Sequence, residues 1–90
     1  MKKDARFYFG NLMSDVARSA RAALENNDAR YEDSLSRARA TLGYLRFAHR
    51  PEAYEEGLLL LCALAYARTE GRLSAFCAHL STLARSFAVL

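Results

Sequence analysis

"EEGLLLLCALAYAR", residues 55–68, decides how this chain folds, because the ten consecutive residues from Leu58 to Ala67 carry neither a charge nor an amide side chain. As a helix, ten residues span only about 15 Å, which is roughly half the thickness of a bilayer core. The stretch is therefore too short to cross a membrane. We expect it to fill a protein core or to meet a partner.

The composition of the whole chain favours one all-α domain. Its 90 residues are 52% hydrophobic and 26% charged, with one Pro and four Gly. This is too apolar for a disordered chain and too poor in turn residues for a protein of many strands. Ala, Leu and Arg are abundant, and all three favour helix. The length is sufficient for a modest core without an obligatory disulfide or metal.

Three breaks in the apolar pattern contain residues typical of helix ends. Asn27 or Asp28 suits the N-cap of a helix. Pro51 suits a first helical turn, and Gly71 suits the left-handed position that follows a helix. The breaks therefore divide the single domain, residues 1–90, into four predicted helices at about 4–25, 29–48, 51–68 and 72–88.

The apolar stripes of these helices predict which residues face each other in an antiparallel arrangement. For the first two helices the expected pairs are Phe9/Leu45, Leu12/Leu42 and Val16/Ala38. For the last two they are Leu61/Leu80, Leu58/Leu83 and Tyr54/Phe87. Both registers place the turns at the observed breaks, so the sequence predicts an antiparallel up-down four-helix bundle.

The third predicted helix has two apolar faces instead of one. The register above assigns one face to the core of the bundle: Leu58, Leu61, Cys62 and Ala65. The second face contains Leu60, Leu64 and Ala67. An outer helix of a small bundle needs only one apolar face, so we expect the second face to form the interface of a homodimer. The alternative is a monomer in which this helix lies unusually deep in the core.

The cysteines predict a reducing environment and no cofactor. Cys62 and Cys77 lie among apolar residues, and the start of the chain does not resemble a signal peptide. We therefore expect both thiols to be reduced and the protein to be cytoplasmic. Cys62, Cys77 and His79 would still lack the fourth ligand that a stable metal site requires. No Gly-rich phosphate loop is present, so we expect neither a metal nor a cofactor.

The arginines of the first two helices form a candidate nucleic-acid contact. The net charge is +3, but residues 1–50 hold ten Lys and Arg against six Asp and Glu, whereas the remainder holds three against four. A row of guanidinium groups can follow phosphates, and the candidates are Arg18, Arg21, Arg39, Arg46 and Arg50. The alternative is a solvated surface with ion pairs, since Asp33 and Arg37 have a favourable i, i+4 spacing. No recognition-helix motif accompanies the row.

One pair of residues is a candidate for catalysis. Arg72 and His79 share a face of the fourth predicted helix, because seven residues are nearly two turns. The spacing resembles the R-x4-6-H motif of HEPN domains, small all-α bundles that dimerise and in several lineages cut RNA. The resemblance covers this motif alone, and Leu73 stands where HEPN domains usually have a polar residue. It implies that His79 would act as acid and base and Arg72 on the phosphate, at a dimer interface. The alternative is a surface Arg and a half-buried, structural His.

Taken together, the residues favour a small cytoplasmic interaction or regulatory module that homodimerises through its third helix and has no catalytic activity. They indicate no membrane contact and do not identify a protein partner other than a second copy. The alternatives are a nucleic-acid-binding module that uses the arginines and a HEPN-like ribonuclease.

Overall fold

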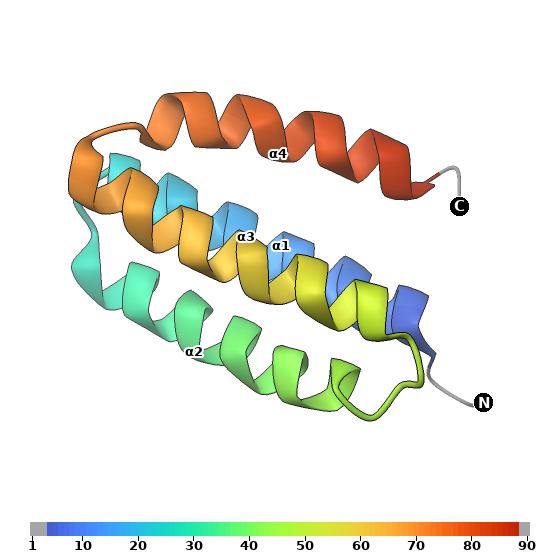
Figure 1. The fold of residues 1–90 in the computed structure, drawn as a ribbon. Coiled ribbons are helices and arrows are strands. Elements are labelled where there is room, and N and C mark those ends of the chain that lie inside the picture. Colours follow the sequence, from blue (N-terminus) through green and yellow to red (C-terminus); the bar gives the residue numbers. More distant parts are fainter. Residues whose placement is uncertain (1–3, 89–90) are drawn as a thin grey trace.

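The chain folds into helices and the turns that join them. The computed structural model describes the backbone of residues 4–88 and the side chains of residues 4–83. Within this range the helices are α1 (Ala5–Leu24), α2 (Asp28–Leu45), α3 (Pro51–Glu70) and α4 (Leu73–Ala88), drawn in Figure 1. No strand occurs between residues 4 and 88, so the predicted all-α class with four helices is confirmed.

The helix ends are stabilised by the residues that occupy them. Asp4 and Asn27 cap α1 and α2, because their side chains accept hydrogen bonds of 3.0 and 3.1 Å from backbone N–H groups three residues further on. Pro51 is the first residue of α3, and Gly71 follows that helix in the left-handed conformation, with φ of 68°. The predicted roles of Asn27, Pro51 and Gly71 are therefore confirmed.

The end of α2 differs from the prediction. The helix was expected to reach residue 48 but ends at Leu45, and a turn follows. His49, in the turn, is exposed and left-handed, with φ of 59°. Pro51 provides the physical reason, because the residue before a proline is disfavoured in the helical region. Arg50 is accordingly non-helical, with φ of −131° and ψ of 80°, so the chain leaves the helix before it.

The other three helices of the described chain pack around α1. α1 contacts α2, α3 and α4, and α3 also contacts α2 and α4, whereas α2 and α4 do not touch within the described residues. In Figure 1, α3 lies in front of α1, and α2 and α4 flank this central pair. The α1–α2 and α3–α4 turns lie at one end of the molecule, and the α2–α3 connection lies at the other. This packing is compatible with a helical bundle.

Most residues of the predicted stripes of α1, α2 and the described part of α4 are buried, whereas Leu24 of α1 is 47% exposed and Leu83 of α4 is half-buried. In α1 and α2 the buried residues include all six of the expected pairs: Phe9, Leu12, Val16, Ala38, Leu42 and Leu45. In α4 the buried residues include Leu73, Phe76 and Leu80. Phe87 lies outside the residues whose side chains the structure describes.

The prediction for α3 is wrong about which face meets the core. Its buried apolar positions include the three residues expected at a dimer interface: Leu60, Leu64 and Ala67. In contrast, Leu58 is 43% exposed, and Cys62 and Ala65 are exposed as well. Of the predicted core face, Leu61 is half-buried and packs against the core. Leu60, Leu64 and Ala67 thus belong to the core of a single chain, and the surplus apolar face is the opposite one.

Gly57 explains this rotation of α3. A Cβ atom at Gly57 would lie 2.6 Å from Leu12 Cδ2 and 3.0 Å from Leu42 Cδ1, so α3 approaches α1 and α2 closely only with this glycine turned inward. Leu60 and Leu64 follow Gly57 by three and seven residues and therefore share its face. The core position of α3 is thus decided by the absence of a side chain, which a count of leucines does not detect.

Truncation of one leucine on each face tests the orientation of α3. Leu64 is 0% exposed and Leu59 is 62% exposed. Leu64→Ala is expected to lower the free energy of unfolding by about 2–5 kcal/mol because it leaves a cavity. Leu59→Ala is expected to change it by about 0.5 kcal/mol or less in the monomer. Urea unfolding followed by circular dichroism at low protein concentration measures both, and equal losses would contradict the orientation.

A matched pair of glycine variants tests the close approach. Gly57→Leu and Gly43→Leu both replace a glycine inside a helix, but a Cβ at Gly43 meets nothing within 4 Å. Both variants gain about 1 kcal/mol of helix propensity, whereas only Gly57→Leu overpacks the core, at a cost of about 1–3 kcal/mol or more. Thermal unfolding should therefore give Gly57→Leu the lower midpoint. A midpoint as high as that of Gly43→Leu would show that the core has room there.

Candidate functional site

The side of α3 that points away from the core is apolar. We call it the outer α3 face, and it consists of Leu58, Leu59, Cys62, Ala65 and Tyr66, none of which is buried. Leu59 and Tyr66 are each 62% exposed. From Leu58 to Tyr66 the face extends about 12 Å along the helix axis. Large apolar side chains gathered on one face make it a candidate contact surface.

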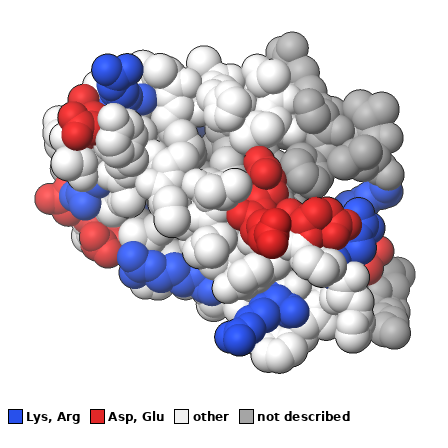
Figure 2. Space-filling view, in the orientation of Figure 1, with Lys and Arg blue, Asp and Glu red and all other residues white. Residues whose placement is uncertain are grey.

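Charged residues flank the outer α3 face, with acidic residues at its start. Glu52, Glu55 and Glu56 precede it, whereas Arg68 and Arg72 follow it, with Glu70 between them. Figure 2 views the molecule from the side of α3 and shows a broad uncharged surface with a group of acidic side chains toward the end where α3 begins. The face is therefore uncharged in its middle and differs in charge between its two ends.

Arg68 joins the end of α3 to the start of α2. Its Nη2 lies 3.0 Å from Asp28 Oδ1, and its Nη1 lies 3.9 Å from Glu32 Oε1. Its guanidinium carbon also lies 4.1 Å from the ring centroid of the buried Tyr31. Sequence reasoning missed this cluster. The spacing of Asp28, Tyr31 and Glu32 on one side of α2 is a signal for a cationic neighbour, but it does not show which helix provides the cation.

Removal of the Arg68 side chain tests this connection. Arg68→Ala is expected to cost about 1 kcal/mol, the sum of a partly exposed cation–π contact and exposed ion pairs. The loss should be smaller at high salt, which screens the ion pairs. Arg39→Ala, at an exposed arginine of α2, is the control and should be neutral. Urea unfolding at low and high salt measures the free energy of unfolding of both variants. If Arg68→Ala lost no more stability than Arg39→Ala, the role of Arg68 would be contradicted.

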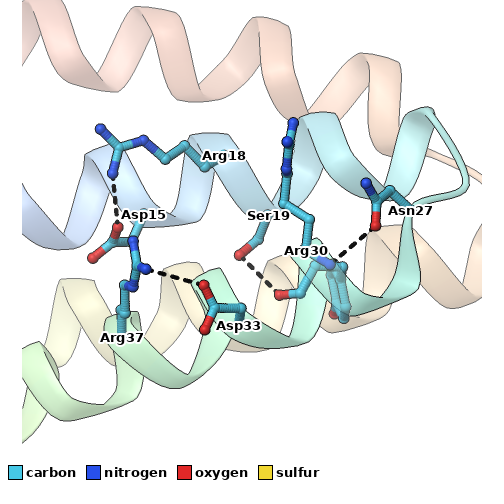
Figure 3. Close-up of polar contacts among 8 residues, drawn as sticks. Asp15, Arg18, Ser19, Asn27, Arg30, Asp33 and Arg37 are labelled. Atoms are coloured by element: carbon cyan, nitrogen blue, oxygen red, sulfur yellow. Dashed lines mark hydrogen bonds and ion pairs between the residues drawn. The ribbon is translucent and has the colours of Figure 1, made fainter.

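A polar cleft between α1 and α2 is internally ion-paired. Its volume is about 460 Å³, and it is lined by Asp15, Arg18 and Arg37 among others. Arg18 Nη1 lies 3.4 Å from Oδ1 of the buried Asp15, and Arg37 Nη2 lies 3.1 Å from Asp33 Oδ2 (Figure 3). Each arginine therefore stands beside a carboxylate that competes with any phosphate, and the cleft is poorly suited to anions.

The five arginines predicted to contact nucleic acid do not line one hollow. Arg18 lines the α1–α2 cleft, whereas Arg21 and Arg50 line a groove of about 720 Å³ between α1 and α4. Arg46 lies 6.0 Å from the ring centroid of Phe47. Arg39 is exposed on α2 and lines neither hollow.

Arg50 already has an acidic neighbour. Its Nε donates a hydrogen bond to Glu52 Oε1. This bond stabilises the charged carboxylate and holds the pKa of Glu52 below its ordinary value of 4.5. Among the five predicted arginines, Arg18 and Arg50 are thus paired with carboxylates, which reduces their capacity to bind phosphate.

Arg72 and His79 occupy exposed positions. Arg72 directly precedes α4, where its carbonyl oxygen accepts a hydrogen bond from the Phe76 backbone N–H, and His79 lies within α4. Neither residue lines the α1–α2 cleft or the α1–α4 groove. Cys62 lies on the outer α3 face and Cys77 lines the α1–α4 groove. Within the described residues, no three His, Cys, Asp or Glu side chains are grouped so that they could hold a metal ion.

Aromatic side chains form a second exposed apolar area, at the start of α1 and the end of α2. Tyr8 stacks on Tyr44 with 5.4 Å between ring centroids, and Phe7 meets Tyr8 edge-on at the same distance. Phe47, just beyond α2, is 75% exposed. Because Phe7, Tyr8 and Tyr44 already pack on one another, part of their apolar surface is covered within the chain.

None of the helices in the described part of the chain combines the length and the apolar character that a bilayer crossing requires. Comparison of the sequence with family models and with curated proteins, and of the fold with solved structures, gives no match. A functional assignment for this chain therefore depends on the chemistry of its own surfaces.

Proposed function

We propose that this chain is a small interaction module, an antiparallel up-down bundle, that forms a homodimer through the outer α3 face. The observation that carries the proposal is the exposure of Leu58, Leu59 and Tyr66 on the side of α3 opposite its buried face. Association of two such faces removes apolar surface from water, which is the dominant favourable term in most protein association. The prediction of a dimer through α3 is retained, but the residues that form it change.

A two-fold axis at Cys62 makes the outer α3 face complementary to itself. With the two α3 helices antiparallel across this axis, Leu58 faces Tyr66 of the partner subunit and Leu59 faces the partner's Ala65. A closed two-fold pair of this kind uses the same surface on both copies. The charged ends contribute little to this pairing, because Glu52 already pairs with Arg50, and Arg68 with Asp28, within each chain.

The dimer is better supported than nucleic-acid binding. The predicted arginines line two different hollows or neither, and two of them already pair with carboxylates. The outer α3 face, in contrast, is continuous and uncharged. The proposal places the protein in the cytoplasm, where its two free thiols remain reduced.

Charge introduced on the outer α3 face tests the dimer. Leu59→Glu and Tyr66→Glu are expected to give folded monomers, because each places a carboxylate in the apolar contact without disturbing the core. Leu64→Glu is expected to unfold the chain instead, since Leu64 is buried. Light scattering measures the mass and circular dichroism the fold. A wild-type chain that is monomeric at tens of micromolar would contradict the proposal.

Oxidation of the cysteines tests which surface of the chain forms the dimer interface. Because a disulfide requires the two Cα atoms to lie within about 7 Å, only a cysteine near the two-fold axis can link the subunits efficiently. Mild oxidation should therefore link the dimer through Cys62, so that Cys62→Ser abolishes the link and Cys77→Ser preserves it. A dimer that is linked through Cys77, or that Cys62 does not link, would show that another surface pairs.

A further inference from the structure

The α1–α4 groove has the size and lining of a ligand site. Its volume of about 720 Å³ lies within the range of roughly 300–1,000 Å³ found for small-molecule sites. The groove follows one side of α1 from Ala5 to Leu24, and Phe9 and Met13 of α1 line it together with Leu80 of α4. These three side chains are buried, so they form an apolar floor over which a chain of methylene groups can lie along α1.

Gly10 keeps part of this groove open. Gly10 lines the groove, and a Cβ atom placed on it would meet nothing within 4 Å. The space beside α1 at this position is therefore not occupied by another described side chain. α1 and α4 pack against one another within the described residues, so the groove runs alongside their contact. An extended acyl chain is narrow enough to lie in such a groove, whereas a helix is about 10 Å across.

The charged residues in the described lining of the groove are all basic. Arg6, Arg21 and Arg50 line it, and none of its described lining residues is acidic. Arg50 pairs with Glu52, but the described side chains give Arg6 and Arg21 no ion pair. Arg6 lies near the start of α1 and Arg50 directly before α3, two points at the same end of the molecule in Figure 1. At this end Arg6 is therefore the residue that can bind an anionic group, since Arg50 already has a carboxylate partner.

We propose that the α1–α4 groove binds a long-chain fatty acid as its anion. The acyl chain lies beside Gly10 and Met13, and the carboxylate is held by Arg6, whose planar guanidinium matches a carboxylate in two hydrogen bonds. Most of the groove belongs to α1 and α4 and not to the outer α3 face. The site therefore does not depend on the proposed dimer, and the two can be tested separately.

Two glycine variants separate a filled groove from an unrelated change. Gly10→Leu places a side chain in the groove, whereas Gly43→Leu makes the same substitution at an open helical position of α2 outside it. Palmitate, kept below its micellar concentration, is titrated against the intact chain by displacement of a fluorescent fatty acid. Wild type and Gly43→Leu should bind equally, and Gly10→Leu should bind at least tenfold more weakly. Circular dichroism shows whether each variant is folded.

Arg6 provides a second, independent readout that does not depend on the glycine variants. Arg6→Glu should weaken palmitate binding at least tenfold while leaving the binding of hexadecanol, which has no charge, unchanged. Arg39→Glu, on α2, is the control and should bind palmitate as the wild type does. Loss of both ligands in a folded Arg6→Glu variant would contradict a contact between Arg6 and the carboxylate.

Three outcomes would overturn the proposal. The first is a wild-type chain that does not displace the fluorescent fatty acid. The second is palmitate binding that a folded Gly10→Leu variant leaves unchanged. The third is attraction to anionic phospholipid vesicles, equal in wild type and Gly10→Leu, without binding of monomeric palmitate, which would indicate adsorption of a basic surface to a membrane.

Discussion

At Gly57 the backbone of α3 comes so close to α1 and α2 that a single added carbon would collide with side chains of Leu12 and Leu42. Leu12 is 0% exposed and therefore has little free space into which to move. The contact sets the rotation of α3 about its own axis. Once Gly57 faces inward, Leu60 and Leu64 enter the core, and the rest of a nearly continuous apolar run must face outward.

The remaining features of α3 follow from that rotation. Arg68 lies beyond the outer α3 face, where it reaches Asp28 and stacks on Tyr31. This cluster fixes the end of α3 against α2, so that the outer face is presented on a supported helix. A preorganised surface loses less conformational entropy on association than a flexible one. The same helix that completes the core of one chain thus provides the surface proposed to meet a second chain.

Much of the fold could be predicted from the sequence, because local chemistry determines it. Asn27, Pro51 and Gly71 mark helix ends by capping, a fixed φ and a tolerated left-handed conformation, and these effects act within a few residues. The buried stripe of α1 was also predictable, since its apolar residues recur at steps of three and four. The early end of α2 was less evident, although Pro51 already restricts the residue that precedes it.

The orientation of α3 could not be predicted by the same reasoning. Both of its faces repeat apolar residues at steps of three and four, so periodicity alone does not distinguish them. Gly57 was the available signal, because a glycine inside a helix often marks a close approach of backbones. The candidate sites were less predictable still. The α1–α4 groove and the Arg68 cluster combine residues from separate helices, and their spacing in the sequence does not reveal these contacts.

The most direct test of this account is the solvent accessibility of the α3 leucine methyl groups, measured by NMR with an inert soluble paramagnetic agent over a dilution series. Leu60 and Leu64 should be protected at every concentration. Leu58 and Leu59 should be broadened in dilute samples and become protected as the concentration rises. Broadening of Leu60 and Leu64, with Leu58 and Leu59 protected in dilute samples, would contradict this account, because α3 would then face the core with its other side.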